Sequence, residues 1–316
     1  MTGVAREGRH RPVLLEQAIA GLKIVADGVY VDGTFGRGGH SKEILKHLGS
    51  HGRLIAIDKD PAAVAAAHEL AAKDPRFVIR SGSFADVARI LAALEIQNGV
   101  QGVLLDLGVS SPQLDTPERG FSFLHEGPLD MRFDPSRGEP AAQWLSRIDE
   151  QELKRVLKEY GEERYSGRIA KAIVSHAKNK GFRSTSELAD LVASVVPARE
   201  KRKHPATRTF QAIRIAINNE LEDLKRFLQD IPEVLAVGGR LVVISFHSLE
   251  DRIVKHFIRR HYRGPEDRMP PGLPVRTQPF LPRLKPVGKI IRPQADELEA
   301  NPRARSAVLR IAERLR

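Results

Sequence analysis

The sequence contains no cysteine, few aromatic residues and no apolar run long enough to cross a membrane. The lack of cysteine excludes thiolate nucleophiles and radical chemistry that depends on an iron–sulfur cluster. Because aromatic residues make up only 5% of the chain, a broad base-stacking platform is not indicated. With no apolar span and no signal peptide, we expect a soluble, cytoplasmic protein.

Basic residues are what the chain has in excess. The 51 Lys and Arg residues against 40 Asp and Glu residues give 316 residues a net charge of +11. The basic residues are bunched in 199–204 and 252–292. A basic surface can simply aid solubility, but this bunching favours an anionic partner, and we predict nucleic acid. Recognition would then depend on phosphate contacts and a pocket for one base.

The first hundred or so residues alternate between strand and helix patterns. Short apolar runs at 28–32, 53–58, 77–79 and 101–106 predict strands, and amphipathic stretches between them predict helices. Ser41 is expected to cap one of these helices, and Asp60 followed by proline another. Strand and helix in series predict a parallel sheet with helices on both faces.

Ligand-type residues follow each predicted strand. They are Asp32, Asp58, Phe84 and Asp106. Each one alone is typical of a helix cap or a turn. Because parallel strands end at one edge of the sheet, where open α/β sheets bind ligands, the set predicts a nucleotide-like cofactor site.

The glycine-rich loop at 33–39 narrows the choice of cofactor. It is not followed by the lysine and hydroxyl residue of a P-loop, so ATP hydrolysis is not indicated. Gly36 and Gly38 are followed by Ser41 where a dinucleotide fingerprint needs a third glycine, so NAD is the weaker alternative. The acids on either side suit S-adenosylmethionine, with Asp58 accepting the ribose hydroxyls and Phe84 against the adenine. Without cysteine, the methyl acceptor would be a heteroatom.

A long helical insertion separates the fourth strand from the next predicted strand, at 239–246. Helices are predicted after the capping residues Asp149 and Ser184, and a third over 210–228. Trp144 is expected to be core. The chain then returns to the sheet, passes a proline-rich stretch at 265–293 and ends in a strand at 306–311.

Eight motifs, in order along the chain, carry a resemblance to a known family. They are His10–Leu15, Asp32–His40, Asp106–Gln113, Arg119–Phe123, Gly127–Arg132, Lys203–Gln211, Ser245–Arg252 and Asn301–Ser306. Over nearly its whole length the chain resembles the bacterial RsmH (MraW) family of 16S ribosomal RNA cytosine N4-methyltransferases. The segment 265–286 matches least well.

The resemblance implies a fold, a reaction and a cofactor site. The fold is α/β, a Rossmann-like class I methyltransferase sheet formed by residues 1–112 and 231–316, with an inserted all-helical domain at 113–230 for substrate recognition. The reaction is methylation by S-adenosylmethionine of the N4 amino group of a cytidine in the decoding region of 16S ribosomal RNA in the small subunit. The implied cofactor contacts are Gly38, Gly39, His40, Asp58, Phe84, Asp106 and Gln113.

Other residues are candidates on the substrate side. Ser110, in the turn after Asp106, is our hypothesis for the catalytic group near the amino nitrogen. Lys203, His204 and Arg208 are predicted to hold RNA phosphates, and His247 either faces the substrate or is a structural hydrogen-bonding residue. Asp130 and Arg132 are expected to pair and order a loop. No histidine spacing indicates a metal site.

Two other classes of function remain open from the sequence. A Rossmann oxidoreductase would bind NAD and not S-adenosylmethionine. An RNA-binding or assembly factor without enzymatic activity would bind RNA and leave the cofactor edge idle. Binding titrations with NAD and with S-adenosylmethionine distinguish the three. The sequence carries no signal of the oligomeric state.

Overall fold

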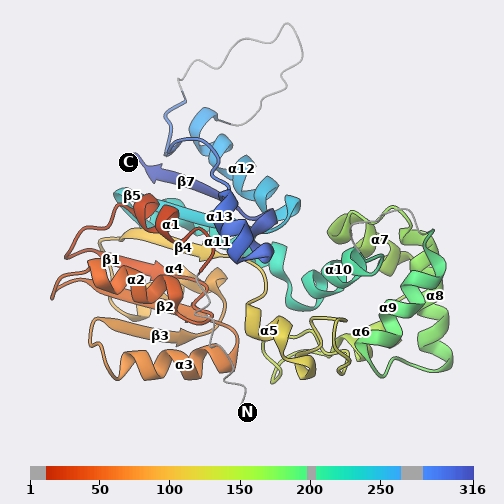
Figure 1. The fold of residues 1–316 in the computed structure, drawn as a ribbon. Helices are drawn as coiled ribbons and strands as arrows, with labels where there is room; N and C mark the ends of the chain where they lie inside the picture. The colour runs from red at the N-terminus through yellow and green to blue at the C-terminus, as the bar shows by residue number, and fades with distance from the viewer. Residues whose placement is uncertain (1–11, 198–203, 265–279) are drawn as a thin grey trace, which may run out of the picture. The chain divides into compact units, whose positions relative to one another are not determined.

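The computed structural model describes residues 12–197, 204–264 and 280–316, and it divides the chain into two compact units. The first unit comprises 1–107 and 224–316, and the second 108–223. The first is built on a seven-stranded sheet of order β3-β2-β1-β4-β5-β7-β6 (Figure 1). Its strands are β1 Val29–Asp32, β2 Arg53–Asp58, β3 Phe77–Ser81, β4 Val100–Asp106, β5 Leu235–Ser245, β6 Leu284–Pro286 and β7 Val308–Arg314.

The predicted site lies where the order of strands in the sheet reverses, between β1 and β4. Strands β1 to β3 run outward to one side, and β4 returns to the other side of β1, all in parallel. Asp32 ends β1 and Asp106 ends β4, so both lie where the order reverses, which is where open α/β sheets bind ligands. The predicted α/β sheet is therefore confirmed.

The end of the sheet departs from a wholly parallel arrangement. β7 inserts between β5 and β6 and is antiparallel to both. The final strand predicted at 306–311 begins later in the structure, at Val308, because 302–306 form the 3-10 helix η3 (Pro302–Ser306). The apolar pattern of a strand does not indicate whether it runs parallel or antiparallel to its neighbours, so the antiparallel pairing of β7 could not be predicted from the sequence.

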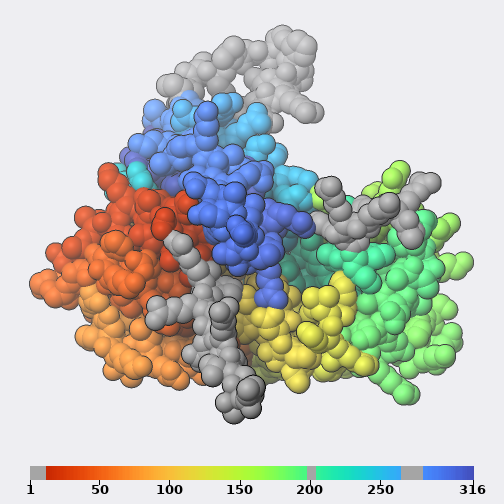
Figure 2. Space-filling model, in the orientation of Figure 1, coloured from red at the N-terminus to blue at the C-terminus, as the bar shows by residue number. Residues whose placement is uncertain are grey.

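Helices cover both faces of the sheet and bury two apolar layers. One layer includes Val87, Leu91, Phe227 and Val254, and the other includes Leu22, Ile44 and Ala67. The helices are α1 Leu15–Leu22, α2 Gly39–His47, α3 Pro61–Ala71, α4 Val87–Ala93, α11 Glu220–Val234, α12 Ser248–Arg263 and α13 Ala295–Ala300. The backbone N–H of Leu14, just before α1, donates to Glu297 of α13 over 2.7 Å, and the red and blue segments touch in Figure 2.

The second unit is helical around its own apolar core, which contains Leu145, Leu153, Ile173, Leu188 and Ile213. Its helices are α5 Ser111–Asp115, η2 Pro117–Arg119, α6 Ala141–Arg147, α7 Glu150–Gly161, α8 Ser166–Asn179, α9 Thr185–Val195 and α10 Thr207–Asn218. The predicted caps of two of these helices are confirmed: the Asp149 side chain accepts from Glu152 N–H, and the Ser184 side chain accepts from Glu187 N–H.

The unit boundaries differ from those expected from the sequence. The single helix predicted over 210–228 is wrong, because Asn219, with a φ of 56°, ends α10 before α11 begins. Leu224, Phe227 and Leu228 of α11 are buried in the sheet's core, so the first unit resumes at 224 rather than 231. The first unit also ends at Leu107, directly after β4, rather than at 112.

Two side-chain predictions in the second unit are confirmed. Asp130 and Arg132 form a two-pronged ion pair, with Nε and Nη2 donating over 2.7 Å each. Trp144 is partly buried against the helical core. Part of the proline-rich stretch lies outside the described residues. Within the described ranges, no helix has the length and apolar character needed to span a bilayer.

Candidate active site

Asp32 organises the loop that follows β1. Its side chain is buried, with Oδ1 accepting from Thr34 N–H at 3.1 Å and Oδ2 accepting from the Ser41 hydroxyl at 2.6 Å. Burial raises the pKa of Asp32 to about 6, against these hydrogen bonds. The predicted capping role of Ser41 is wrong, because α2 begins two residues earlier and Ser41 lies inside it, bonded to Asp32. Asp32 therefore shapes the glycine loop.

The glycine loop exposes backbone at the rim of the sheet, by which we mean the edge where the parallel strands β1 to β4 end. Gly36 has a φ of +54°, and a Cβ built there would meet no heavy atom of the described chain within 4 Å. Gly38, with a φ of +71°, is the N-cap of α2, and a Cβ there would lie 2.5 Å from the Phe35 ring. The first backbone N–H groups of α2, from Gly39 and His40, point out of the helix start and suit an anionic group such as a carboxylate.

Asp58 ties the glycine loop to the end of β2. Its Oδ2 accepts from Gly36 N–H at 2.7 Å and its Oδ1 from Asp60 N–H at 2.9 Å. Burial raises the pKa of Asp58 to about 6 despite these bonds. Each oxygen of a carboxylate has a second lone pair, so Asp58 can still accept two hydroxyl groups of a ligand. The Asp60 cap of α3 is confirmed, with Asp60 accepting from Ala62 N–H at 3.0 Å.

Phe84 stands at the start of the 3-10 helix η1 (Phe84–Asp86), directly after β3 and its loop. Its ring is partly buried and meets Phe227 edge to face, with centroids 5.5 Å apart. Gly82, before it, has a φ of +151°, and a Cβ there would have no described neighbour within 4 Å. Phe84 is therefore a fixed apolar ring beside open backbone.

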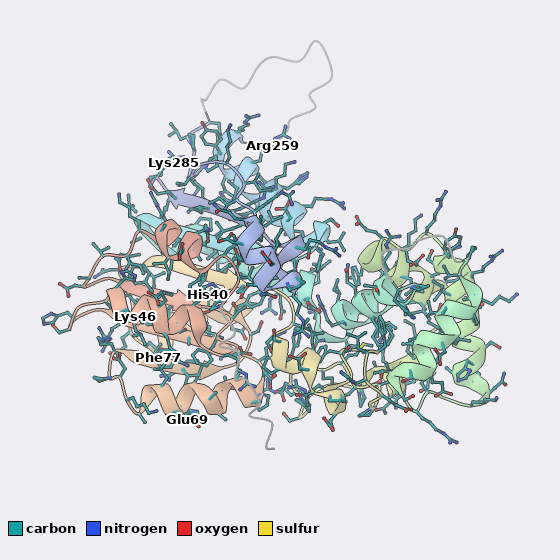
Figure 3. All side chains as sticks on the ribbon, in the orientation of Figure 1. His40, Lys46, Glu69, Phe77, Arg259 and Lys285 are labelled. Atoms are coloured by element: carbon teal, nitrogen blue, oxygen red, sulfur yellow. The ribbon has the colours of Figure 1, made fainter. Side chains whose placement is uncertain are left out.

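Asp106 and His40 form an unusual buried pair. His40 Nδ1 lies 3.7 Å from Asp106 Oδ2, and His40 is 5% exposed (Figure 3). Burial lowers the pKa of His40 to about 4, and burial together with the charges of Asp32 and Glu250 raises the pKa of Asp106 to about 8. Near pH 7 both groups are therefore mainly neutral, so the contact is not an ion pair. Within the described chain, His40 Nε2 and Asp106 Oδ1 are buried without a hydrogen-bond partner.

The electrostatics of this rim suit a cation. Burial is the largest cause of the raised pKa of Asp58 and of Asp106. The charges of Asp60 and Asp32 add to it at Asp58, those of Asp32 and Glu250 add to it at Asp106, and no described base offsets either shift. A cationic ligand would stabilise these carboxylates in their charged form. S-adenosylmethionine fits this donor set: a sulfonium and an ammonium for the acids, a carboxylate for the start of α2, and hydroxyls for Asp58.

Other predicted site residues belong to the second unit. Gln113 is buried, and its Oε1 accepts from the Ser110 N–H at 2.9 Å at the start of α5. His204 Nδ1 accepts from Ala206 N–H at 3.2 Å, and the imidazole lies against the Phe123 ring, 4.6 Å between centroids. Arg208 lies in the first turn of α10. Lys203 lies outside the described residues.

His247 has a structural role in the first unit. It is the N-cap of α12, its side chain accepts from Glu250 N–H, and its Nε2 lies 3.1 Å from Glu250 Oε1. Glu250 in turn accepts from the backbone N–H of Phe246 at 2.8 Å. Of the two roles predicted for His247, the structural one is confirmed.

Two further residues, Thr34 and Glu250, and a second role for Ser41 complete the rim. Thr34 Oγ1 accepts from Asp106 N–H at 2.6 Å, which joins the loop after β1 to the end of β4. Ser41 fixes Asp32, and Glu250 raises the pKa of Asp106. The available signal was a hydroxyl residue two positions after Asp32. In the described part of the chain, no three His, Cys, Asp or Glu residues are placed to hold a metal ion.

Comparison with known proteins gives consistent results. The profile described as the MraW methylase family matches residues 7–315. The ribosomal RNA small subunit methyltransferase H of Thioalkalivibrio sulfidiphilus (strain HL-EbGR7) is 56% identical over 307 residues, 97% of each chain. An rRNA methylase from Streptococcus thermophilus (11% identity, TM-score 0.40, 98% and 100% covered) and fibrillarin from Aeropyrum pernix (7%, 0.40, 94% and 73%) are among the similar solved structures. The family assignment therefore depends on the sequence matches.

Proposed function

The chain belongs to the MraW methylase family, and we propose that it methylates the N4 amino group of a cytidine in the decoding region of 16S ribosomal RNA. Membership of a methylase family confirms the predicted cofactor, S-adenosylmethionine. The proposal of an RNA substrate is supported by the 56% identity, across 97% of both chains, to a ribosomal RNA small subunit methyltransferase H. Small subunits are a cytoplasmic substrate, which is where we propose that the protein acts.

Residues of the rim would hold the cofactor in distinct ways. Asp58 would accept the ribose hydroxyls, and Phe84 would lie against the adenine. The backbone N–H groups of Gly39 and His40 would bind the carboxylate of the methionine moiety. Asp106, whose Oδ1 is buried and unpartnered within the described chain, would accept from its ammonium group. Gln113 remains a proposed contact from the second unit.

The cofactor supplies an activated methyl group, which leaves alignment as the protein's main task. The lone pair of a cytosine amino group is delocalised into the ring, so an acceptor must hold the amino protons and turn the lone pair toward the methyl group. Orientation of this kind can supply on the order of 7–11 kcal/mol. The absence of cysteine is consistent with direct attack by nitrogen, which needs no thiolate adduct.

Ser110 is our candidate for the group near the amino nitrogen. It precedes α5, and its backbone is held by Gln113. We expect Ser110→Ala to lower kcat with little effect on KM for the cofactor. Ser110→Gly, which preserves a tolerated N-cap residue, controls for loss of the helix start. Unchanged turnover in both variants would reject this role.

The second unit is proposed to recognise the RNA. A target base must be unstacked to reach a methyl donor, which suits a loop or a single strand. Arg208 and Lys203 would contact phosphates. His204, whose ring is tilted against that of Phe123, would contribute an exposed ring edge. His247 is assigned to the structure of α12 and is not proposed as an RNA contact.

The direct test is methyl transfer from labelled S-adenosylmethionine to naked 16S RNA and to purified small subunits, followed by identification of the modified nucleoside. N4-methylcytidine in the decoding region supports the proposal, and the more active substrate identifies the natural one. A different nucleoside, or no label in either RNA, would contradict it. Calorimetry with NAD and with S-adenosylmethionine separates the remaining alternatives.

A further inference from the structure

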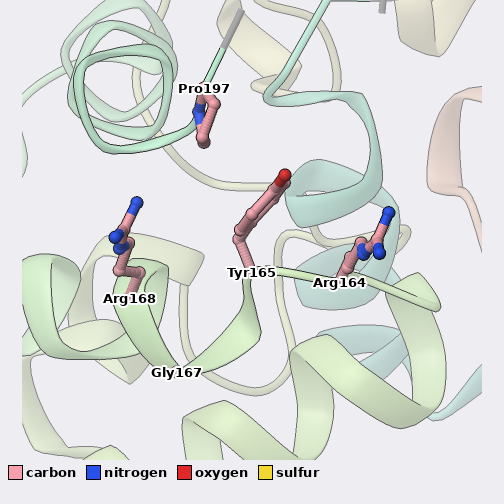
Figure 4. Close-up of a pocket in the computed structure, with 5 residues that line it drawn as sticks. All are labelled: Arg164, Tyr165, Gly167, Arg168 and Pro197. Atoms are coloured by element: carbon pink, nitrogen blue, oxygen red, sulfur yellow. The ribbon is translucent and has the colours of Figure 1, made fainter. Parts of the chain in front are cut away.

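A cavity of about 500 Å³ lies in the second unit at the start of α8. It is lined by Arg164, Tyr165, Gly167, Arg168 and Pro197, none of which was predicted as a site residue. In Figure 4 the Tyr165 hydroxyl oxygen points into the space between Pro197 and the two arginine side chains. The volume is in the range of pockets that bind small molecules or a nucleotide unit.

Within the described residues, no acidic side chain compensates the charge of the two arginines of this cavity. Both are exposed, and neither has an ion pair or a hydrogen bond with any described residue. The neighbouring acid, Glu163, is buried, and its Oε1 accepts from the Tyr165 N–H at 2.9 Å.

Other arginines of the same unit are paired. Arg155 lies between Glu152 and Glu159, Arg147 contacts Glu139, and Arg132 is held by Asp130. Against this background, the guanidinium groups of Arg164 and Arg168, which have no partner in the described ranges, are available to a ligand.

Arg168 lies in the first turn of α8 and Arg164 lies just before the helix begins, where positive charge is electrostatically unfavourable unless an anion binds. The first turn of this 14-residue helix contains Arg168 and no acid. The N-terminus of a helix carries a partial positive charge, so bases are destabilising there and anions are stabilising. An anion in the cavity would meet the guanidinium groups, the helix start and the Tyr165 hydroxyl together.

We propose that the cavity formed by Arg164, Tyr165 and Arg168 binds phosphodiester groups of the RNA substrate. This inference rests on the proposed function and assigns to it a specific phosphate contact. Guanidinium groups match phosphate oxygens in two-pronged hydrogen bonds. Exposed arginines suit a polymer backbone that passes over the surface.

The test compares charge removal at the two ends of α8 in the full-length protein. The test variant is Arg164→Gln/Arg168→Gln. The matched control is Lys178→Gln/Lys180→Gln, which removes two exposed charges from the end of the helix. Arg164→Lys/Arg168→Lys keeps the charge. The probe is a fluorescent single-stranded RNA of mixed sequence, titrated at several salt concentrations.

We expect the test variant to bind RNA about 5- to 20-fold more weakly at 0.1 M salt, and its slope of log K against log salt to become less steep by about 0.7 to 1.4, as loss of one or two phosphate contacts requires. The Lys178/Lys180 control should stay within about threefold of the wild type, and the Arg164→Lys/Arg168→Lys variant should lie between the test variant and the wild type, because lysine keeps the charge but not the two-pronged contact. Without RNA, the unfolding midpoint of the test variant should equal or exceed that of the wild type, because a base is removed from a helix start.

Several outcomes would overturn the inference. One is an unchanged slope in the test variant, and another is an equal loss in the Lys178/Lys180 control, which would indicate diffuse charge. Binding of inorganic phosphate that depends on the two arginines, with RNA binding unaffected, would identify a site for a free anion. If the wild type binds RNA but transfers no methyl group, the proposed function fails while the cavity stands. If it binds no RNA, both fail.

Discussion

The charged form of the Asp106 carboxyl is unfavourable in the folded chain, and a cationic ligand beside it would stabilise that form. Its pKa is about 8 in the folded chain, against about 3.9 in an unfolded one. Between these values the folded state binds the proton and the unfolded state does not, so stability falls as the pH rises toward 8. His40 shows the opposite sign, because its folded pKa of about 4 makes stability rise from pH 4 to 6.5.

The window from pH 6.5 to 8 therefore isolates Asp106, since Asp32 and Asp58 titrate near 6. We predict that the free energy of unfolding of the wild type, without cofactor, falls there by roughly 1–2 kcal/mol. Asp106→Asn should lack this component of the fall. Denaturant unfolding at intervals of half a pH unit measures both, and parallel profiles for the two proteins would contradict the assigned pKa.

Asp58 is predicted to trade stability for cofactor affinity. Hydrogen bonds to a charged acceptor contribute about 1.5–3 kcal/mol, so Asp58→Asn should weaken binding of S-adenosylmethionine by about 10- to 100-fold in calorimetry. Asparagine keeps one oxygen acceptor for the two backbone N–H groups that Asp58 holds, but it removes a charge whose raised pKa shows that it is unfavourable in the free protein. The two effects oppose each other, so stability at pH 7.5 should change by less than about 2 kcal/mol. The exposed acid Glu69, on α3, provides the control Glu69→Gln. Equal affinity in both variants would remove Asp58 from the site.

The sequence could predict which residues lie at the rim but not what each one does there. Asp58 and Asp106 follow apolar strands, and that pattern alone places them at the sheet edge. The role of Asp32 in holding Thr34 and Ser41 depends on the path of the loop. Glu250 is distant in the sequence and reaches Asp106 electrostatically only because β5 lies beside β4.

At the scale of elements, the turn from β1 into α2 offers a matched pair of glycines. Gly38→Ala should destabilise the protein by about 2 kcal/mol or more, because it adds backbone strain at a positive φ and places a Cβ 2.5 Å from the Phe35 ring. Gly36→Ala also lies at a positive φ but meets no described atom within 4 Å, so about 1 kcal/mol of strain is expected.

Thermal unfolding of the two variants measures this difference, and cofactor calorimetry adds a second readout. We expect Gly36→Ala to lose cofactor affinity despite its small effect on stability, because the added methyl group would enter the open space at the rim. Equal destabilisation by both substitutions would show that contact with the Phe35 ring is relieved by a shift of that side chain.

The elements themselves were predictable to different degrees. Strand β2 matches its predicted bounds because its apolar run ends abruptly in Asp58. The apparent helix over 210–228 was misleading, since Asn219 breaks it through a positive φ that helical periodicity does not register. The pairing of β7 with β5 and β6 is a long-range choice, and nothing in a local pattern determines it.

At the scale of the whole molecule, the chain divides into a unit built on a sheet and a helical unit with its own core. The insertion itself was evident from the long stretch of sequence between β4 and β5. Its limits were less evident, because α11 starts at the end of the helical unit and then buries Leu224 and Phe227 in the core of the sheet. An amphipathic helix does not specify which of two cores it faces.

The net charge of +11 gives a prediction for the full-length protein. If RNA is held mainly through phosphates, log affinity should fall linearly with log salt, with a slope of about −0.7 for each contact to a single strand. With Arg164, Arg168 and Arg208 in contact, the slope should be about −2 or steeper. Cofactor affinity should change far less, because one small ligand in a partly buried site releases few counterions. Fluorescence titration of RNA and calorimetry of S-adenosylmethionine over the same salt range measure both. A flat RNA plot would remove phosphate contacts as the basis of recognition, and would leave base-specific contacts in the helical unit to supply the affinity.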